Sequence, residues 1–195
     1  FDHFSFQTIT SEQFLNYLDK NLLQKKPGIV SRGQVEQWLY QPGLPSDAVI
    51  PQSSALNTAA ALAKSWSAGE ISIDRVPAST WAPKVVIHFI NNLSPDLSQE
   101  RLKEVDEALG LSHSTNAEIA RTWFIQVAQR RYKPAYANLE AHLNRYGRTR
   151  LVKPVYAALA ENGQDLETAR RMFADARGLY HPITIAAVES VLKLR

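Results

Sequence analysis

Apolar residues along this 195-residue chain recur at intervals of three and four, the spacing that lines one face of an α-helix. The pattern is clear in Ser53–Gly69, where alanines and leucines form a broad apolar face with small residues, and again in Gln99–Leu109. Strict alternation of apolar and polar residues, the mark of a strand, is rare. The sequence therefore predicts an all-α protein of about ten helices joined by short turns.

Caps and breakers divide the chain into these helices. Thr10 or Ser11 is expected to cap the first, Lys25–Gly28 to end it, and Gly147 to end the helix that Pro134 opens, as a C′ glycine. The other predicted helices are one around Trp38, then Ser53–Gly69, Lys84–Leu93, Gln99–Leu109, one capped by Thr115 or Asn116, one with Pro154 in its early part, Leu166–Ala176 and Pro182–Leu194. Successive helices should pair as antiparallel hairpins in a right-handed αα superhelix, an irregular relative of armadillo and HEAT arrays.

The expected domain organisation is an extended lead-in over 1–10 followed by a single helical domain over 11–195. Gln41–Pro51 holds three prolines and a glycine and cannot be regular structure. Trp38, Leu44 and Ile50 offer apolar anchors, so we expect an ordered crossing loop there rather than a linker. Because the only methionine is Met172, we expect the chain to be a fragment or processed product of a longer protein.

Composition narrows the chemistry. The chain has no cysteine, which excludes disulfides and cysteine-ligated metal sites and is compatible with a cytoplasmic location. No apolar run approaches the roughly 20 residues of a bilayer span. None of the five histidines begins an H-E-x-x-H motif or has another four residues away, so no metal site is expected. Glycine-rich nucleotide loops and nucleophile motifs are absent too, and His181 and the four tryptophans are expected to be structural.

One window concentrates the positive charge. The net charge is +3, yet the stretch from Arg130 to Lys153 holds seven basic residues and one acid. Within it, Arg148 and Arg150 flank Thr149 at a predicted break between helices. Arginine can grip a carboxylate or phosphate with two donors, and the next helix would add free N–H groups. The physical chemistry permits an anion clamp, while a solvated basic surface at a turn explains the same residues.

Four segments together resemble a known family. These are Trp38–Pro45 (W-L-Y-x-P-G-L-P), Asn116–Ile119 with Trp123, Gly147–Pro154, and Tyr180–Thr184. In this order they resemble the C-terminal domain of the leukotriene A4 hydrolase-like zinc aminopeptidases, in a bacterial-type member. The resemblance extends from the lead-in to the last helix, and Trp38–Pro45 is its most specific part.

The resemblance implies that catalysis and binding of the peptide carboxylate are carried out by two different domains. The zinc ion, its ligands and the catalytic glutamate would belong to an upstream thermolysin-like domain, so this chain has no cofactor or catalytic residue of its own. The helical domain would pack on that domain, form one wall of the peptide cleft and bind the carboxylate of a short peptide. The matching residue is Arg148, with Arg150 as its helper where the animal enzymes usually have lysine. The other five basic residues of the window are then expected to be solvated.

The resemblance favours an aminopeptidase parent protein over an epoxide hydrolase, with no nucleic-acid or membrane partner. A different class of function stays open beside it. The chain could be a free-standing αα-repeat module that binds acidic peptides or nucleic acid on its basic ridge. Nucleic-acid binding would need a continuous basic stripe, whereas a focused cluster around Arg148 suits a small anion.

Overall fold

The computed structural model describes residues 2–161 and 163–194, and the elements in these ranges are all helices and turns. Contacts within the chain divide it into two compact units, one ending at Gln52 and the other beginning at Ser53. This division differs from the predicted lead-in over 1–10 and domain over 11–195, and those boundaries stay a prediction. Part of the lead-in, Asp2–Phe4, is a single 3-10 turn (η1) rather than extended chain.

The first unit is built on two helices. α1 (Ser11–Leu18) begins at a capping box, in which Thr10 accepts from the Gln13 N–H and the Gln13 side chain accepts from the Thr10 N–H. It continues into one turn of π-helix, η2 (Asp19–Leu23). α2 (Arg32–Tyr40) starts at the same kind of box between Ser31 and Gln34. Both starts follow the sequence signals.

The loop after α2 joins the two units. Its predicted anchors Leu44 and Ile50 are 71% and 61% exposed, and Trp38 is 53% exposed. The boundary between the units lies at the end of this segment, and its interpretation as an ordered crossing loop rather than a linker stays a prediction. Local proline content defines an irregular segment but does not say whether its apolar residues find a partner.

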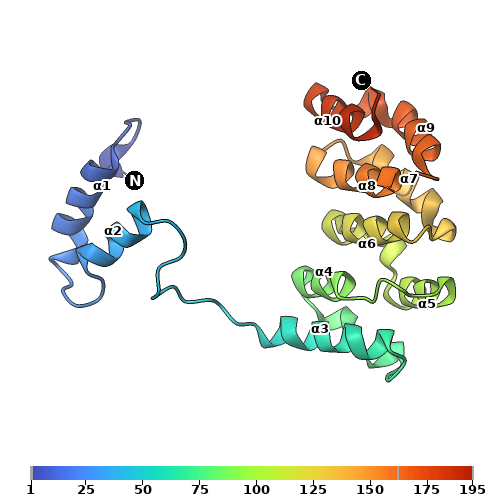
Figure 1. Cartoon of the computed structure of the whole chain (residues 1–195), viewed down its shortest axis with the longest axis horizontal. Coiled ribbons are helices and arrows are strands. Elements are labelled where there is room, and N and C mark those ends of the chain that lie inside the picture. The colour runs from blue at the N-terminus through green and yellow to red at the C-terminus, as the bar shows by residue number, and fades with distance from the viewer. Residues whose placement is uncertain (1, 162, 195) are drawn as a thin grey trace. The chain divides into compact units, whose positions relative to one another are not determined.

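The second unit stacks its helices in tiers from α3 to α10 (Figure 1). Successive contacts run from α3 to α4, then α6, α8 and α10. The bounds are α3 (Ser54–Ser67), η3 (Ile73–Arg75), η4 (Ala78–Thr80), α4 (Pro83–Asn91), α5 (Gln99–Leu109), η5 (Leu111–His113), α6 (Ala117–Gln129), η6 (Lys133–Ala135), α7 (Tyr136–Arg145), α8 (Thr149–Glu161), α9 (Leu166–Ala176), η7 (Arg177–Leu179) and α10 (Pro182–Leu192). The all-α fold is confirmed, while the right-handed superhelix stays a prediction.

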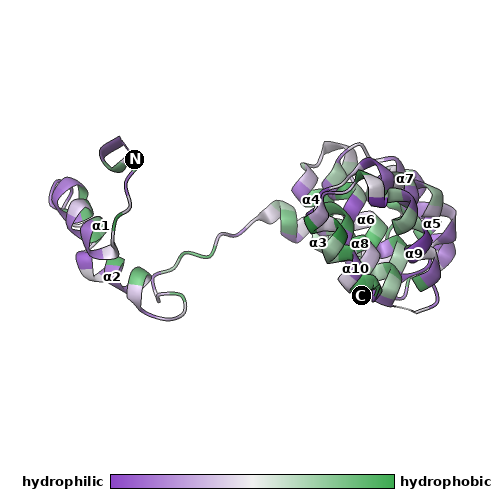
Figure 2. Ribbon diagram, turned by 90° about the horizontal axis from the view of Figure 1, so that it is seen from above, coloured by the Kyte–Doolittle hydropathy of each residue, from purple (hydrophilic) through white to green (hydrophobic). Residues whose placement is uncertain are grey.

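The core of this unit lies between the tiers. Figure 2 shows hydrophobic residues where helices of the unit pack together and hydrophilic ones on outer surfaces. Trp66, Trp123 and Tyr156 have no exposed surface, so two of the four tryptophans are core residues as predicted. Burial of such large rings contributes about 1.5–3 kcal/mol each to the free energy of unfolding. Among the described residues, no helix combines the length and hydropathy that a membrane crossing requires.

Candidate functional site

The candidate site is the turn between α7 and α8, where the sequence reads Tyr146-Gly147-Arg148. Gly147 was expected to adopt the left-handed conformation, but its φ is not positive. The glycine is required for a different reason: an added Cβ would lie 2.9 Å from the backbone oxygen of Leu179. The turn thus passes directly against the segment that precedes α10.

The start of α10 fixes this turn from the other side. The Thr184 hydroxyl, in a residue only 2% exposed, donates to the carbonyl oxygen of Gly147 at 3.1 Å. It also lies 2.6 Å from the Thr149 hydroxyl, at the first residue of α8. Tyr180 donates to the carbonyl oxygen of Leu143 at 2.8 Å, which holds the last turn of α7. Three hydrogen bonds from the Tyr180–Thr184 segment therefore fix the backbone on which the two arginines stand.

His181 has the structural role that the sequence predicted. It precedes α10, and its Nδ1 accepts a hydrogen bond from the Ile183 N–H at 3.2 Å, so the imidazole caps the helix. His142 is also structural, in α7 behind the turn. Its Nε2 lies 3.4 Å from the Leu151 oxygen of α8, and its ring packs on Phe124 and Tyr146. Burial, assisted by the charge of Arg121, lowers the pKa of His142, so the neutral form donates from Nε2.

Arg148 is exposed and ends the turn. Its carbonyl oxygen accepts from the N–H groups of Leu151 and Val152, so Arg148 is the residue from which α8 begins. Its guanidinium makes no ion pair or hydrogen bond with any residue that the structure describes. The first turn of α8 has no acidic side chain to occupy its free N–H groups. A free guanidinium at a helix start offers two kinds of donor to an anion.

Arg150 is already engaged. Its guanidinium forms an ion pair with Glu118, in the first turn of α6, although 63% of the Arg150 side chain is exposed. The two arginines predicted for the site are thus two positions apart in the chain, but only Arg150 has an acidic partner among the described residues. The sequence offered no signal for this pairing, because Glu118 and Arg150 are 32 positions apart and only the packing of α6 on α8 joins them.

Three further basic residues of the window are bound rather than solvated, contrary to expectation. Arg131 and Lys133 both contact the buried carboxylate of Asp165, which also accepts from the Tyr136 hydroxyl at 2.8 Å. Burial by itself would raise the pKa of Asp165, but the bonds from Lys133 and Tyr136 and the two cationic charges lower it below its usual value. Arg130 donates to the backbone oxygen of Ser94 at 2.9 Å. The basic window is therefore a set of local contacts and not a continuous stripe.

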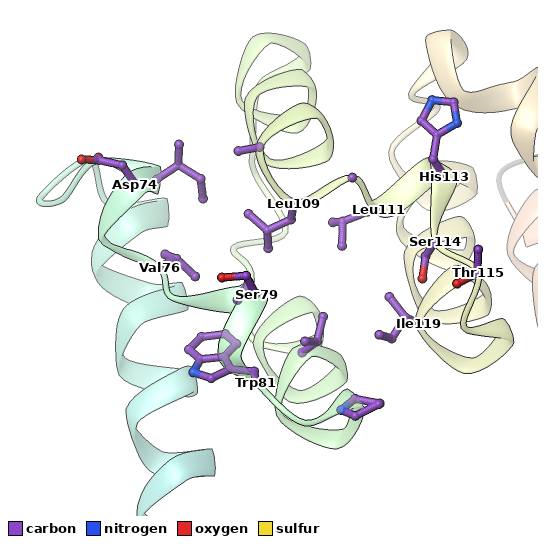
Figure 3. A pocket seen from close by; sticks show the side chains of 16 residues that line it. Asp74, Val76, Ser79, Trp81, Leu109, Leu111, His113, Ser114, Thr115 and Ile119 are labelled. Carbon is purple, nitrogen blue, oxygen red and sulfur yellow. The ribbon is translucent and has the colours of Figure 1, made fainter.

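A cavity with a volume of about 680 Å³ lies elsewhere in the second unit. Figure 3 shows Val76, Trp81, Leu109, Leu111 and Ile119 around it, between the η3–η4 segment and the connection from α5 to α6. Polar residues such as Asp74, Ser79 and His113 also line it, whereas neither Arg148 nor Arg150 does. The sequence predicts no helix between Gly69 and Lys84 and gives no sign of a cavity there. Nor do the described residues include any group of three histidine, aspartate or glutamate side chains that could hold a metal ion.

Comparison with known proteins gives three consistent results. The model of the family described as "Leukotriene A4 hydrolase, C-terminal" matches residues 81–192, a range that includes both arginines and starts after the Trp38–Pro45 segment. Aminopeptidase B of Mus musculus is 26% identical over 204 residues, covering 98% of this chain and 31% of the relative. Leucine aminopeptidase 2 of Pyricularia oryzae is 27% identical over 190 residues, covering 94% of this chain and 30% of the relative.

A solved structure shares the fold. Native yeast LTA4 hydrolase superposes with a TM-score of 0.71 at 21% identity, covering 91% of this chain and 32% of that one. The chain thus spans about a third of the length of the proteins it matches. The comparisons leave the bacterial type of the member untested.

Proposed function

Because this chain belongs to the leukotriene A4 hydrolase C-terminal family, we propose that it is the non-catalytic domain of a zinc aminopeptidase. Relatives named as aminopeptidases, of which it spans about 30%, support this proposal. In it, the chain packs on a catalytic domain of the same polypeptide, forms one wall of the peptide cleft and binds the peptide carboxylate. The parent enzyme releases N-terminal residues from short peptides.

The observation that carries the proposal is the contrast around Arg148. Most basic residues of its window contact an acid or a backbone oxygen, whereas the guanidinium of the exposed Arg148 forms no ion pair or hydrogen bond with the described residues. The Thr184 and Tyr180 hydroxyls donate to the backbone oxygens of Gly147 and Leu143, so the turn that carries Arg148 is preorganised while the guanidinium stays available. A rigid backbone that carries an available guanidinium is suited to bind a carboxylate.

Zinc does not fit this chain. A hydrolytic zinc site needs three protein ligands with an open position, and the described residues gather no such group. The chain's own part in the reaction is to bind and orient the peptide by its far end. In the proposal, the metal chemistry therefore belongs to the catalytic domain, and Arg150 assists Arg148 through its charge.

The proposal is tested with Arg148→Ala in the full-length enzyme. We expect kcat/KM for an alanyl tripeptide to fall on the order of 30- to 900-fold, which corresponds to about 2–4 kcal/mol for a lost charged hydrogen bond in a partly desolvated cleft. The C-terminal amide of the same tripeptide should change little. Lys153→Ala is the matched control, since Lys153 is an exposed cation of the same helix. Unchanged kcat/KM for the free tripeptide would remove Arg148 from this role.

The alternative of a free-standing nucleic-acid module has less support. Arg131 and Lys133 are bound to Asp165, and Arg150 is bound to Glu118, which leaves separate cations instead of a continuous ridge. Titration with single-stranded and duplex oligonucleotides at low salt tests it. Binding that weakens steeply as salt rises would favour the alternative over the aminopeptidase domain.

A further inference from the structure

One acidic residue, Glu118, lies beside the basic turn and contacts two guanidinium groups. Its Oε1 accepts from Nη2 of Arg150 on α8, and its Oε2 lies 3.5 Å from Nη2 of Arg121 on its own helix. The side chains of Glu118 and Arg121 are 29% and 25% exposed, so both are partly withdrawn from solvent. Glu118 therefore links α6 to α8 at the helix ends nearest to Arg148.

The start of α6 fixes the position of Glu118. Asn116 caps the helix, and its side-chain oxygen accepts from the Glu118 N–H at 3.0 Å. The Glu118 carbonyl oxygen accepts from the Thr122 hydroxyl at 2.7 Å. A carboxylate in the first turn is also favoured by the helix dipole. The cap of α6 thus sets where Arg150 of α8 is held.

The two arginines of the turn consequently differ in what they can offer an anion. The Arg148 guanidinium has no ion-pair or hydrogen-bond partner among the described residues. Arg150 must break its ion pair with Glu118 before it can contact a ligand directly. If Arg150 leaves, Glu118 keeps only the longer contact to Arg121 within a half-buried site. A partly buried carboxylate that loses a charged partner is destabilised.

We propose that Glu118 is a positioning residue that restrains Arg150 and makes the Arg148 site selective for a single carboxylate over a dianion. The proposal rests on the carboxylate-binding function proposed above. A ligand with one negative charge needs direct contact only with Arg148. Arg150 stays paired with Glu118 and attracts the ligand through its positive charge. A second negative charge beside the Arg150–Glu118 pair would be repelled by the Glu118 carboxylate, because like charges oppose binding.

The test uses three substrates of the full-length enzyme: an alanyl tripeptide, the same tripeptide ending in aspartate, and the alanyl tripeptide amide. Glu118→Gln keeps the shape and an acceptor oxygen but removes the charge. The ratio of kcat/KM for the aspartate peptide to that for the alanyl tripeptide should rise about five- to tenfold, the size expected for removing one nearby charge. Arg150→Gln should lower the same ratio, because Glu118 then loses its cation.

Glu140→Gln is the matched control. Glu140 also joins two helices through an ion pair, to Arg171 of α9 at 2.6 Å, and its side chain is 27% exposed. This variant should leave the ratio at the wild-type value. If Glu118→Gln impairs folding, as a thermal melt would reveal, the Arg150→Gln arm still measures the ratio from the other side of the ion pair.

Two outcomes overturn the inference. One is an unchanged ratio in folded Glu118→Gln and Arg150→Gln enzymes, and the other is an equal loss of kcat/KM for all three substrates, which indicates an ordinary link between helices. Arg148→Ala separates the two proposals. If that variant still prefers the free carboxylate to the amide, the proposed function itself fails. If the preference is lost but Glu118→Gln leaves the ratio unchanged, only the role of Glu118 fails.

Discussion

The hydroxyl oxygens of Thr149 and Thr184 lie 2.6 Å apart, joining the first residue of α8 to the first turn of α10. Thr184 also donates to Gly147, so a single buried hydroxyl holds both sides of Arg148. The position of the Arg148 backbone thus depends on a residue 36 positions later in the chain. Variants of Thr184, Gly147 and His142 test the contacts that hold this turn.

Thr184→Val keeps the shape of the side chain and removes its hydroxyl. The Gly147 oxygen and the Thr149 hydroxyl then lose a partner in a part-buried place, so we expect the free energy of unfolding to fall by about 1–2 kcal/mol. Urea denaturation of the variant measures this change. Thr115→Val, at an exposed threonine, should alter the free energy of unfolding by less than about 0.5 kcal/mol. Equal stabilities of the two variants would contradict the role given to the Thr184 hydroxyl.

Gly147→Ala tests the close approach of the turn to Leu179. The added Cβ would lie 2.9 Å from a backbone oxygen, which cannot move aside as a flexible side chain would. We expect the free energy of unfolding to fall by about 1–3 kcal/mol, as in other overpacked sites. Gly178→Ala, next to Leu179, has nothing within 4 Å of its added Cβ and should be nearly neutral. Thermal melts of both variants provide the comparison, and an unaffected Gly147→Ala protein would show that the contact is tolerant.

His142 should make stability depend on pH. Burial and the charge of Arg121 lower its pKa in the folded chain, so below about pH 6.5 the unfolded chain binds a proton that the folded chain does not. The contribution of His142 is therefore fully present above that pH and is lost as pH falls through the folded pKa. Urea denaturation between pH 8 and pH 5 should show that the free energy of unfolding decreases as the pH is lowered, and that it decreases less in His142→Gln than in the wild-type protein.

Local sequence signals predicted the elements of the site better than its contacts. The capping residues Thr10 and Asn116 act as expected and Pro182 opens α10, whereas Pro134 lies in the 3-10 turn before α7 and Pro154 lies inside α8. Gly147 was predicted at the right turn for the wrong reason, since the requirement is space against Leu179 and not a left-handed φ. A glycine in a sequence looks the same in both cases, because the neighbour that decides between them is remote.

The sequence by itself determined the helical fold, the turn between α7 and α8, and the family to which the chain belongs. Helix periodicity, caps and breakers act over a few residues, so they can be read directly from the chain. Only the tertiary structure decided that Arg150 is paired with Glu118, that Arg131 and Lys133 share Asp165, and that the Arg148 guanidinium has no ion pair or hydrogen bond with the described residues. Charge counts cannot separate these arginines, because the availability of each depends on which acid the packing of another helix brings beside it.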